Sequence, residues 1–164
     1  MRKLAQQLLR GLAALHKAGW IHRDLKPDNL LLNHHDGLRI ADLGCAARIG
    51  AVHSPLVGTA AYRSPEIFMG STTYTSAVDV WSAAAILAEM SGRRLFPSAS
   101  SSDGEAKVVM QILRVVGSAP VGWMARNAHP DVRAIVGQRL ERPLKPDLKY
   151  QEPRCPALAS MTWP

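Results

Sequence analysis

With 164 residues, of which 47% are hydrophobic and 20% charged, the chain is long enough for one globular domain with a buried core and too short for two ordinary domains. Lys+Arg 20 against Asp+Glu 13 give a formal net charge of +7, but no basic run or aromatic patch accompanies it, so no nucleic-acid partner is expected. We expect an intracellular protein, cytoplasmic or nuclear and without a membrane partner, because Cys45 and Cys155 lack disulfide or zinc-site spacing and no apolar stretch could span a bilayer or direct secretion.

The first expected elements are a helix over residues 2–18 and a small β-hairpin. The helix follows from apolar positions at steps of four, four and three, which share one helical face: Leu4, Leu8, Leu12 and Leu15. Gly19 follows where helices often end. The hairpin is predicted by two short apolar runs, residues 30–32 and 38–40, on either side of the turn-forming pair Asp36 and Gly37.

A long loop and two further helices are expected next. Residues 43–70 are rich in Gly, Ser, Thr and Pro without any period, which is typical of a functional loop. Ser76 and Asp79 have the spacing of a capping box, and residues 80–90 are apolar nearly all round, which predicts a buried helix at the core of the domain. Residues 105–116 resume a helical pattern.

The region after Leu140 is expected to lack regular structure because it carries five prolines. We therefore place the domain at residues 1–140 and an irregular proline-rich tail at residues 141–164.

The densest chemistry lies in the eight residues H-R-D-L-K-P-D-N, from His22 to Asn29. Phosphoryl transfer needs a carboxylate to orient and deprotonate a hydroxyl, a cation to offset phosphate charge, and oxygen ligands for magnesium. Asp24, Lys26 and Asn29 can supply these three roles. The segment resembles the catalytic loop of serine/threonine protein kinases at every motif position. The resemblance implies Asp24 as the catalytic base, Lys26 as a γ-phosphate contact and Asn29 as a magnesium ligand.

Asp42-Leu43-Gly44 is similar to the D-F-G motif that follows the catalytic loop in kinases. The resemblance implies Asp42 as the other magnesium ligand. Leu43 replaces the family's phenylalanine, which affects aromatic packing but not the metal carboxylate. An isolated aspartate before glycine can also be a simple turn residue.

The segment from Gly58 to Glu66 resembles the end of a kinase activation loop, with S-P-E in place of A-P-E. Its Tyr-Arg pair is similar to the cyclin-dependent and mitogen-activated branch, so Arg63 implies specificity for proline after the phosphorylated residue. The resemblance also implies that Thr59 braces Asp24 and Lys26. It gives Glu66 a structural role, although nothing after Leu140 matches the arginine that usually pairs with it.

Ser54 is a candidate phosphorylation site, because it lies five residues before Thr59, where cyclin-dependent kinases carry their activating threonine. Arg23 is the basic residue expected to bind the added phosphate. An ordinary Ser-Pro turn formed with Pro55 is the alternative.

Asp79-Val80-Trp81-Ser82 resembles the kinase D-V-W-S motif, whose aspartate binds the backbone of the catalytic loop; the alternative is the capping box, and both roles can coexist. The other histidines have no metal-ligand spacing and are expected at the surface: His16, His34, His35, His53 and His129.

The resemblance implies a mainly α fold, a protein-kinase C-terminal lobe with one small β-hairpin, which is part of an α+β domain in a complete kinase. It also implies ATP and Mg²⁺ as cofactors, protein substrates with Ser/Thr-Pro sites, and a cyclin-like or upstream kinase partner. The expected function is ATP-dependent phosphorylation of protein serine or threonine. No glycine-rich phosphate loop precedes Asp24, so the isolated chain is expected to be inactive. The alternative is a truncated, pseudokinase-like interaction module, which has no need for Asp24, Lys26, Asn29 and Asp42 together.

Overall fold

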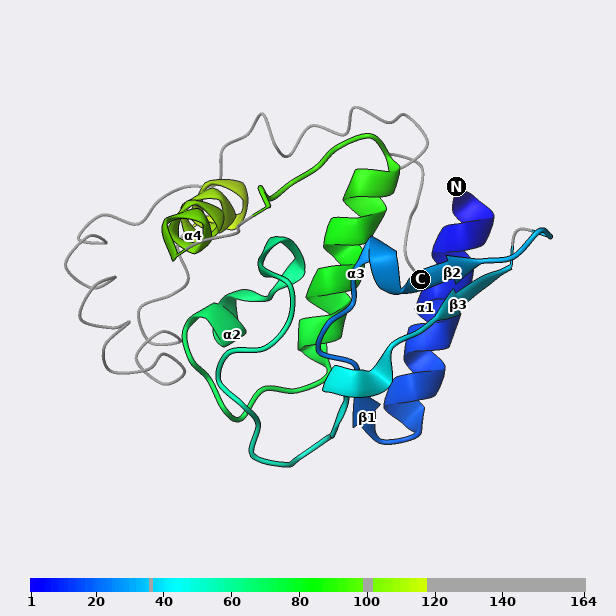
Figure 1. The fold of residues 1–164 in the computed structure, drawn as a ribbon, viewed down its shortest axis with the longest axis horizontal. Coiled ribbons are helices and arrows are strands. Elements are labelled where there is room, and N and C mark those ends of the chain that lie inside the picture. The colour runs from blue at the N-terminus through cyan, green and yellow to red at the C-terminus, as the bar shows by residue number, and fades with distance from the viewer. Residues whose placement is uncertain (36, 99–101, 118–164) are drawn as a thin grey trace.

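The computed structural model describes residues 1–35, 37–98 and 102–117 (Figure 1). Four α-helices are present in this part of the chain: α1 (Arg2–Lys17), α2 (Pro65–Phe68), α3 (Ala77–Met90) and α4 (Ser102–Val116). The strands are β1 (Trp20–Ile21), β2 (Leu30–Leu32), β3 (Leu38–Ile40) and β4 (Ala47–Arg48). None of the helices in these ranges has the length and apolar character needed to cross a membrane. The domain boundary at residue 140 and the tail at residues 141–164 lie outside the described residues.

The mainly α fold is confirmed, and α1 forms where the leucine spacing predicts it. Leu8 and Leu12 are its buried residues, and they join the core from the helix face that contacts α3. The helix ends before Gly19, whose φ of +85° is a backbone conformation that glycine adopts without steric cost. In Figure 1, α1 and the green helix α3 run side by side, and α4 lies on the far side of α3 from α1.

The predicted β-hairpin is also confirmed. Strands β2 and β3 pair antiparallel, with Leu31 opposite Arg39 at the centre. The side chain of Asn33 closes the turn, because its Oδ1 accepts hydrogen bonds from the backbone N–H of His35 at 3.0 Å and of Gly37 at 2.7 Å. The hairpin packs on α1 through β3.

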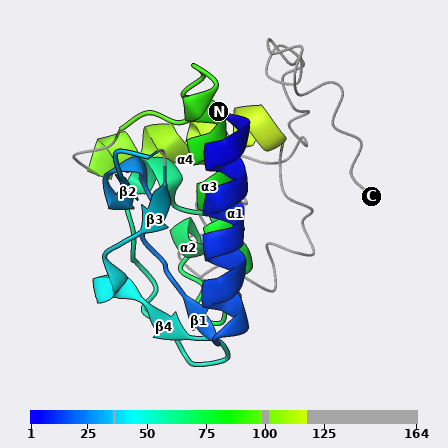
Figure 2. The ribbon, with the colours of Figure 1, turned by 90° about the vertical axis from the view of Figure 1, so that its right-hand side faces the viewer.

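A second two-stranded sheet, which the sequence did not predict, joins β1 to β4. Trp20 pairs with Arg48 and Ile21 with Ala47, in antiparallel register. The Arg48 guanidinium carbon also lies 4.5 Å from the centre of the Trp20 ring. Figure 2 shows this sheet at the end of α1 where the chain leaves the helix. This sheet holds the start of the long loop next to Trp20 and Ile21, the two residues that precede the segment His22–Asn29.

The prediction of a capping box at the start of α3 is wrong. Ser76 has helical backbone angles, and its side chain makes no capping hydrogen bond. The carboxylate of Asp79 is used elsewhere, as described below. The expectation that this helix is buried is confirmed by Val78, Ala83 and Ile86.

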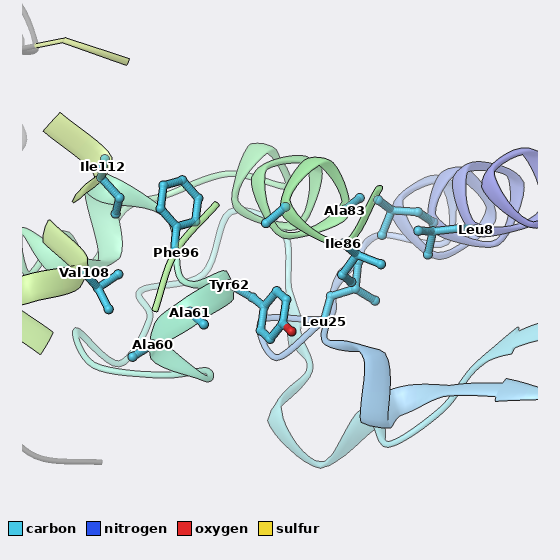
Figure 3. Close-up of a cluster of buried hydrophobic side chains, with 12 residues drawn as sticks. Leu8, Leu25, Ala60, Ala61, Tyr62, Ala83, Ile86, Phe96, Val108 and Ile112 are labelled. Atoms are coloured by element: carbon cyan, nitrogen blue, oxygen red, sulfur yellow. The ribbon is translucent and has the colours of Figure 1, made fainter. Parts of the chain in front are cut away.

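The core joins the helices to two loop segments (Figure 3). Leu25 of the segment between β1 and β2, and Tyr62 just before α2, lie among buried side chains from α1, α3 and α4. The Trp81 ring of α3 stacks on Phe96 at 5.5 Å between centroids. The chemistry-bearing loops are therefore part of the packed core and are not held by their ends alone.

Candidate active site

Asp79 fixes the segment His22–Asn29 from the buried start of α3. Its carboxylate is fully buried and accepts hydrogen bonds from the backbone N–H groups of His22 at 2.8 Å and Arg23 at 2.9 Å. These are the contacts that the resemblance implies for Asp79. Arg23 has a φ of +70°, a strained conformation for a residue with a side chain, and its bond to Asp79 holds it there.

His16 adds a third contact to Asp79 that the sequence did not reveal. Its Nε2 lies 2.8 Å from Oδ2 of Asp79, so His16 is not the free surface histidine that was expected. No local pattern could have indicated this contact, because the two residues are 63 positions apart.

His22 ties the segment to the D-L-G motif. Its ring is fully buried, Nδ1 accepts from the backbone N–H of Asp24 at 3.3 Å, and Nε2 lies 2.9 Å from the carbonyl oxygen of Ala41. This pattern corresponds to a neutral ring with its proton on Nε2. The backbone N–H of Ala41 also donates to the Asn29 carbonyl at 2.9 Å. The two motifs are thus held side by side by contacts on both sides of Ala41.

Asp24, Lys26 and Thr59 form one hydrogen-bonded cluster. Oδ1 of Asp24 accepts from both the backbone N–H and the hydroxyl of Thr59, each at 2.8 Å. Nζ of Lys26 lies 3.0 Å from Oδ2 of Asp24 and donates to the Thr59 hydroxyl at 3.1 Å. Burial by itself would raise the pKa of Asp24, but the hydrogen bonds from Thr59 and Lys26 outweigh it and lower that pKa below its ordinary value. Asp24 is therefore ionised at neutral pH and can accept a hydrogen bond from a substrate hydroxyl.

Several carboxylates gather around the ammonium group of Lys26. Its hydrogen bond to Asp24 raises the pKa of Lys26, and the negative charges of Asp24, Asp28 and Asp42 add to this against the opposing effect of burial. A cation at this position is suited to neutralising a transferred phosphate without losing its own charge.

Asn29 and Asp42 fit a magnesium site. Nδ2 of the buried Asn29 donates to the Asp24 carbonyl at 2.9 Å, which leaves its side-chain oxygen as an acceptor. Asp42 is exposed, and its Oδ1 accepts a 3.2 Å hydrogen bond from the backbone N–H of Gly44. The described residues contain no group of three or more His, Cys, Asp or Glu side chains placed to hold a metal. Mg²⁺ does not need such a group, because it commonly takes one or two protein ligands and completes its shell with water and substrate phosphate.

Arg63 is held from several directions at once. Its guanidinium donates to the Gly58 carbonyl at 2.7 Å and 3.2 Å and to the Val57 carbonyl at 3.0 Å. Its Nη1 lies 2.9 Å from Oε1 of Glu105 on α4, and its guanidinium carbon lies 4.8 Å from the centre of the Phe68 ring. The Arg63 side chain is 10% exposed and that of Glu105 is 41% exposed. The role of Glu105 could not be found from the sequence, because it comes from a helix 42 residues away.

Position 58 requires glycine because the backbone there passes close to the backbone of Arg23. It has a φ of +82°, and a Cβ at this position would lie 2.5 Å from the carbonyl oxygen of Arg23. The contact places the end of the long loop against the backbone next to Asp24. A side-chain carbon on the Gly58 α-carbon would therefore require one of these two backbone segments to move.

Gly58→Ala is expected to lower the free energy of unfolding by about 1 to 3 kcal/mol more than Gly50→Ala, because only Gly58 adds overpacking against a backbone to the strain of a positive φ. Gly50 is a matched control: its φ is +83°, and a Cβ there would meet nothing within 4 Å. Urea unfolding of the 164-residue chain and both variants measures the difference. Equal losses for the two variants would show that the Gly58 contact yields at no cost.

The side chain of Arg23 is connected to the backbone of Ser54 by hydrogen bonds through the Tyr74 hydroxyl. Nε of Arg23 donates to the Cys45 carbonyl at 2.6 Å, and Nη1 donates to the Tyr74 hydroxyl at 3.3 Å. The Tyr74 hydroxyl in turn donates to the Ser54 carbonyl at 3.1 Å. Ser54 itself is exposed.

Two further expectations concern the surface position of His53 and the structural role of Glu66. His53 is buried, at 4% exposure, so its expected surface position is wrong. Glu66 lies in the first turn of α2, and its carboxylate makes no hydrogen bond or ion pair within the ranges that the structure describes. The residue that would pair with Glu66 was expected beyond Leu140, outside those ranges.

Comparison with known proteins places these motifs in a larger context. The sequence profile described as "Protein kinase domain" matches residues 1–142. A protein of Rattus norvegicus, "Serine/threonine-protein kinase ICK", is 41% identical over 121 residues, which cover 72% of this chain and 19% of that protein. Its namesake from Mus musculus is 40% identical over the same length and coverage. The chain thus spans about a fifth of the length of these relatives.

A solved structure has a similar fold. It is the "Crystal Structure of the yeast RNA Pol II CTD kinase CTDK-1 complex", which matches with a TM-score of 0.78 and 26% sequence identity. The match covers 95% of this chain and 53% of the chain in that complex.

Proposed function

The chain belongs to the protein kinase domain family, and from this premise we propose that it forms the catalytic-loop lobe of an enzyme that transfers the γ-phosphoryl group of ATP to serine or threonine hydroxyls of proteins. The observation that carries the proposal is the cluster in which Thr59 and Lys26 hold the carboxylate of Asp24 ionised and oriented. A lobe that only bound partners would have no need to fix this carboxylate from three sides.

The proposed mechanism assigns one task to each side chain of the cluster. Asp24 orients the substrate hydroxyl and accepts its proton as the oxygen bonds to the γ-phosphorus and the bond to the β-phosphate oxygen breaks. Lys26 neutralises charge on the transferred group. Asn29 and Asp42 would hold Mg²⁺, which supplies positive charge to the phosphates when bound. Thr59 holds the side chains of Asp24 and Lys26 in position through its hydrogen bonds to both.

Three exposed leucines mark where the rest of a kinase domain would dock. Leu31 and Leu32 belong to strand β2 of the hairpin and Leu43 to the D-L-G motif, and their exposed fractions are 56%, 62% and 56%. Large apolar side chains exposed beside a polar site are typical of a surface that a further domain covers. We therefore propose that the chain alone has negligible activity, and that an N-terminal lobe and an activating cyclin-like subunit or upstream kinase complete it.

The proposed specificity for proline is supported by the occupied carbonyl of Gly58. Arg63 already donates twice to this oxygen, so it is poorly placed to accept from the backbone N–H of a substrate residue. Proline has no N–H and loses nothing there, whereas another residue would leave its N–H without a partner. This supports a preference for Ser-Pro and Thr-Pro sites.

Arg63→Ala in a complete kinase domain that carries this chain is expected to lower the ratio of kcat/KM for a Ser-Pro peptide to that for the matched Ser-Ala peptide by about tenfold, because the Gly58 carbonyl becomes free to accept. Steady-state phosphorylation of both peptides measures the ratio. Arg94→Ala is the control, since Arg94 is exposed and donates to Ser98. An unchanged ratio would refute the proline preference, and no transfer to either peptide by the unaltered domain would refute the proposed function.

Ser54→Ala in the same domain is expected to reduce turnover after treatment with an activating kinase by about tenfold, because the phosphate that would order the loop can no longer be added. The measurement compares the variant with Thr73→Ala, which removes another exposed hydroxyl from the loop before α3. If activation of the Ser54 variant is undiminished, Ser54 is an ordinary Ser-Pro turn residue.

A further inference from the structure

His53 is the buried residue of an otherwise exposed part of the long loop. Of the seven residues Gly50–Leu56, which we call the His53 segment, six are exposed, whereas His53 is only 4% exposed. The His53 ring stacks on Tyr74, with centroids 4.5 Å apart and planes inclined by 19°. The side chain of His53 is therefore what packs this segment against the rest of the lobe.

The hydrogen bonds of the His53 segment converge on the same place. The backbone N–H of His53 donates to the Thr72 carbonyl at 2.8 Å, and the carbonyl of Ser54 accepts from the Tyr74 hydroxyl at 3.1 Å. Within the described residues, the remaining hydrogen bond of the segment is a local turn contact from Ala51 to the residue three positions earlier. The segment is thus attached between its ends at one point, opposite residues 72–74.

The His53 ring has no partner for a proton at this point. Neither Nδ1 nor Nε2 makes a hydrogen bond in the part of the chain that the structure describes. Arg23 and Tyr74 are the charged and titratable groups that face the ring there, and neither supplies a carboxylate. The guanidinium of Arg23 donates to the Tyr74 hydroxyl at 3.3 Å, so positive charge is already present beside the stack. An imidazolium in this position would be both buried and unpaired, which is costly.

The same surroundings act on the proton affinity of the ring. Burial lowers the pKa of His53 from its ordinary value of 6.5, and the positive charge of Arg23 lowers it further. A His53 ring released into water would regain the ordinary value. The attached and released forms of the segment therefore differ in how readily they bind a proton.

We propose that His53 is an acid-sensitive anchor: the neutral ring holds the His53 segment against residues 72–74, and a proton bound to the ring releases the segment. The proton comes from solvent and binds the unprotonated ring nitrogen, after which both nitrogens donate to water. Release uncovers Tyr74, which packs in a buried cluster with Ile21, Ile67 and Val78. This behaviour goes beyond the proposed function, because it needs neither ATP nor a substrate.

The direction of the pH dependence follows from the lowered pKa of the attached ring. The contribution of His53 to attachment is fully present above pH 6.5, because both forms of the segment are then neutral at this position. As the pH falls below 6.5 the released form binds the proton first, so release becomes more favourable by up to about tenfold per pH unit. The effect levels off below the pKa of the attached ring, where both forms carry the proton.

The first test is a pH titration of the histidine rings by ¹H–¹⁵N NMR on the 164-residue chain. The pKa of the His53 ring is expected below 6.5. The ring of His34, which is exposed in the hairpin turn, is the internal reference. A pKa of His53 equal to or above that of His34 would overturn the proposal.

The second test is amide hydrogen exchange at His53, because release frees its N–H from the Thr72 carbonyl. The protection factor of this amide, which corrects for the intrinsic pH dependence of exchange, is expected to fall about threefold or more from pH 7.5 to pH 5.5. The amide of Gly117, which donates to the Leu113 carbonyl at the end of α4, reports any general loss of stability and is expected to change less. An equal fall at both amides would overturn the proposal.

His53→Phe removes the titrating group and keeps an aromatic ring that can stack on Tyr74. Protection of the amide at position 53 is expected to be the same at pH 7.5 and pH 5.5 in this variant. His34→Phe makes the same change at an exposed histidine and is expected to keep the pH dependence. A fall in His53→Phe as large as in the unaltered chain would show that another group binds the proton. If His53→Phe does not fold, the two measurements on the unaltered chain decide the matter.

Discussion

Asp24→Asn in a complete kinase domain that carries this chain is expected to lower kcat by about a hundredfold to ten-thousandfold. The amide retains the size of the carboxylate and can still accept from Thr59, but it cannot take the proton of a substrate hydroxyl. It also removes the negative charge that Lys26 contacts at 3.0 Å. Steady-state turnover of a protein substrate measures the loss, while KM for ATP is expected to change little.

Asp28→Asn is the matched control for Asp24→Asn. Asp28 is an exposed aspartate four residues further along the same segment, so its replacement makes the same chemical change outside the hydrogen-bonded cluster. Asp28 acts on Lys26 through its charge alone and makes no hydrogen bond to it, so turnover of this control is expected to stay within about threefold of the unaltered domain, far above that of Asp24→Asn. Full turnover in Asp24→Asn, with an unchanged fold by circular dichroism, would refute Asp24 as the base.

Asp79→Ala in the 164-residue chain is expected to lower the free energy of unfolding by about 3 to 5 kcal/mol. The truncation leaves the buried backbone N–H groups of His22 and Arg23 without their acceptor. It also releases Arg23 from the contact that holds its backbone at a φ of +70°. Urea unfolding followed by far-ultraviolet circular dichroism measures the change.

Asp79→Asn distinguishes the acceptor role from a packing role. The amide keeps one oxygen for one of the two backbone donors and has nearly the same volume, so its loss of stability is expected to be smaller than that of Asp79→Ala. Val80→Ala at the next position is the background control, because Val80 is 54% exposed. A loss in Asp79→Ala no larger than in Val80→Ala would show that the loop backbone finds other partners.

Elements set by local spacing could be predicted from the sequence. The leucine steps place α1 within a residue at each end, and the two apolar runs with their Asp-Gly turn place the hairpin at its observed strands. The candidate site was predictable in part for the same reason: Asp24, Lys26 and Asn29 are close in sequence, and the motif spacing limits where they can lie. The contacts of Thr59 with Asp24 came from the resemblance and not from spacing.

Contacts that depend on the tertiary fold could not be predicted in this way. Strands β1 and β4 have two residues each, which is too short for an alternating pattern. His53 and Tyr74 come together only when the long loop folds back on the segment before α3. The predicted capping box has the correct sequence spacing but does not form. The Asp79 carboxylate instead accepts hydrogen bonds from two backbone N–H groups that lie 56 and 57 residues away.

The ion pair between Arg63 and Glu105 connects the proposed proline preference to helix α4. Arg63 is nearly buried beside the Gly58 carbonyl, but the carboxylate that neutralises it stands at the solvent-facing side of another helix. A partner cation that binds Glu105 competes with Arg63 for the carboxylate, and replacement of Glu105 removes it; both changes are expected to loosen the position of the guanidinium beside Gly58. Under the proposed proline preference, a substitution on α4 is therefore expected to change selectivity without any change in the residues that contact the substrate.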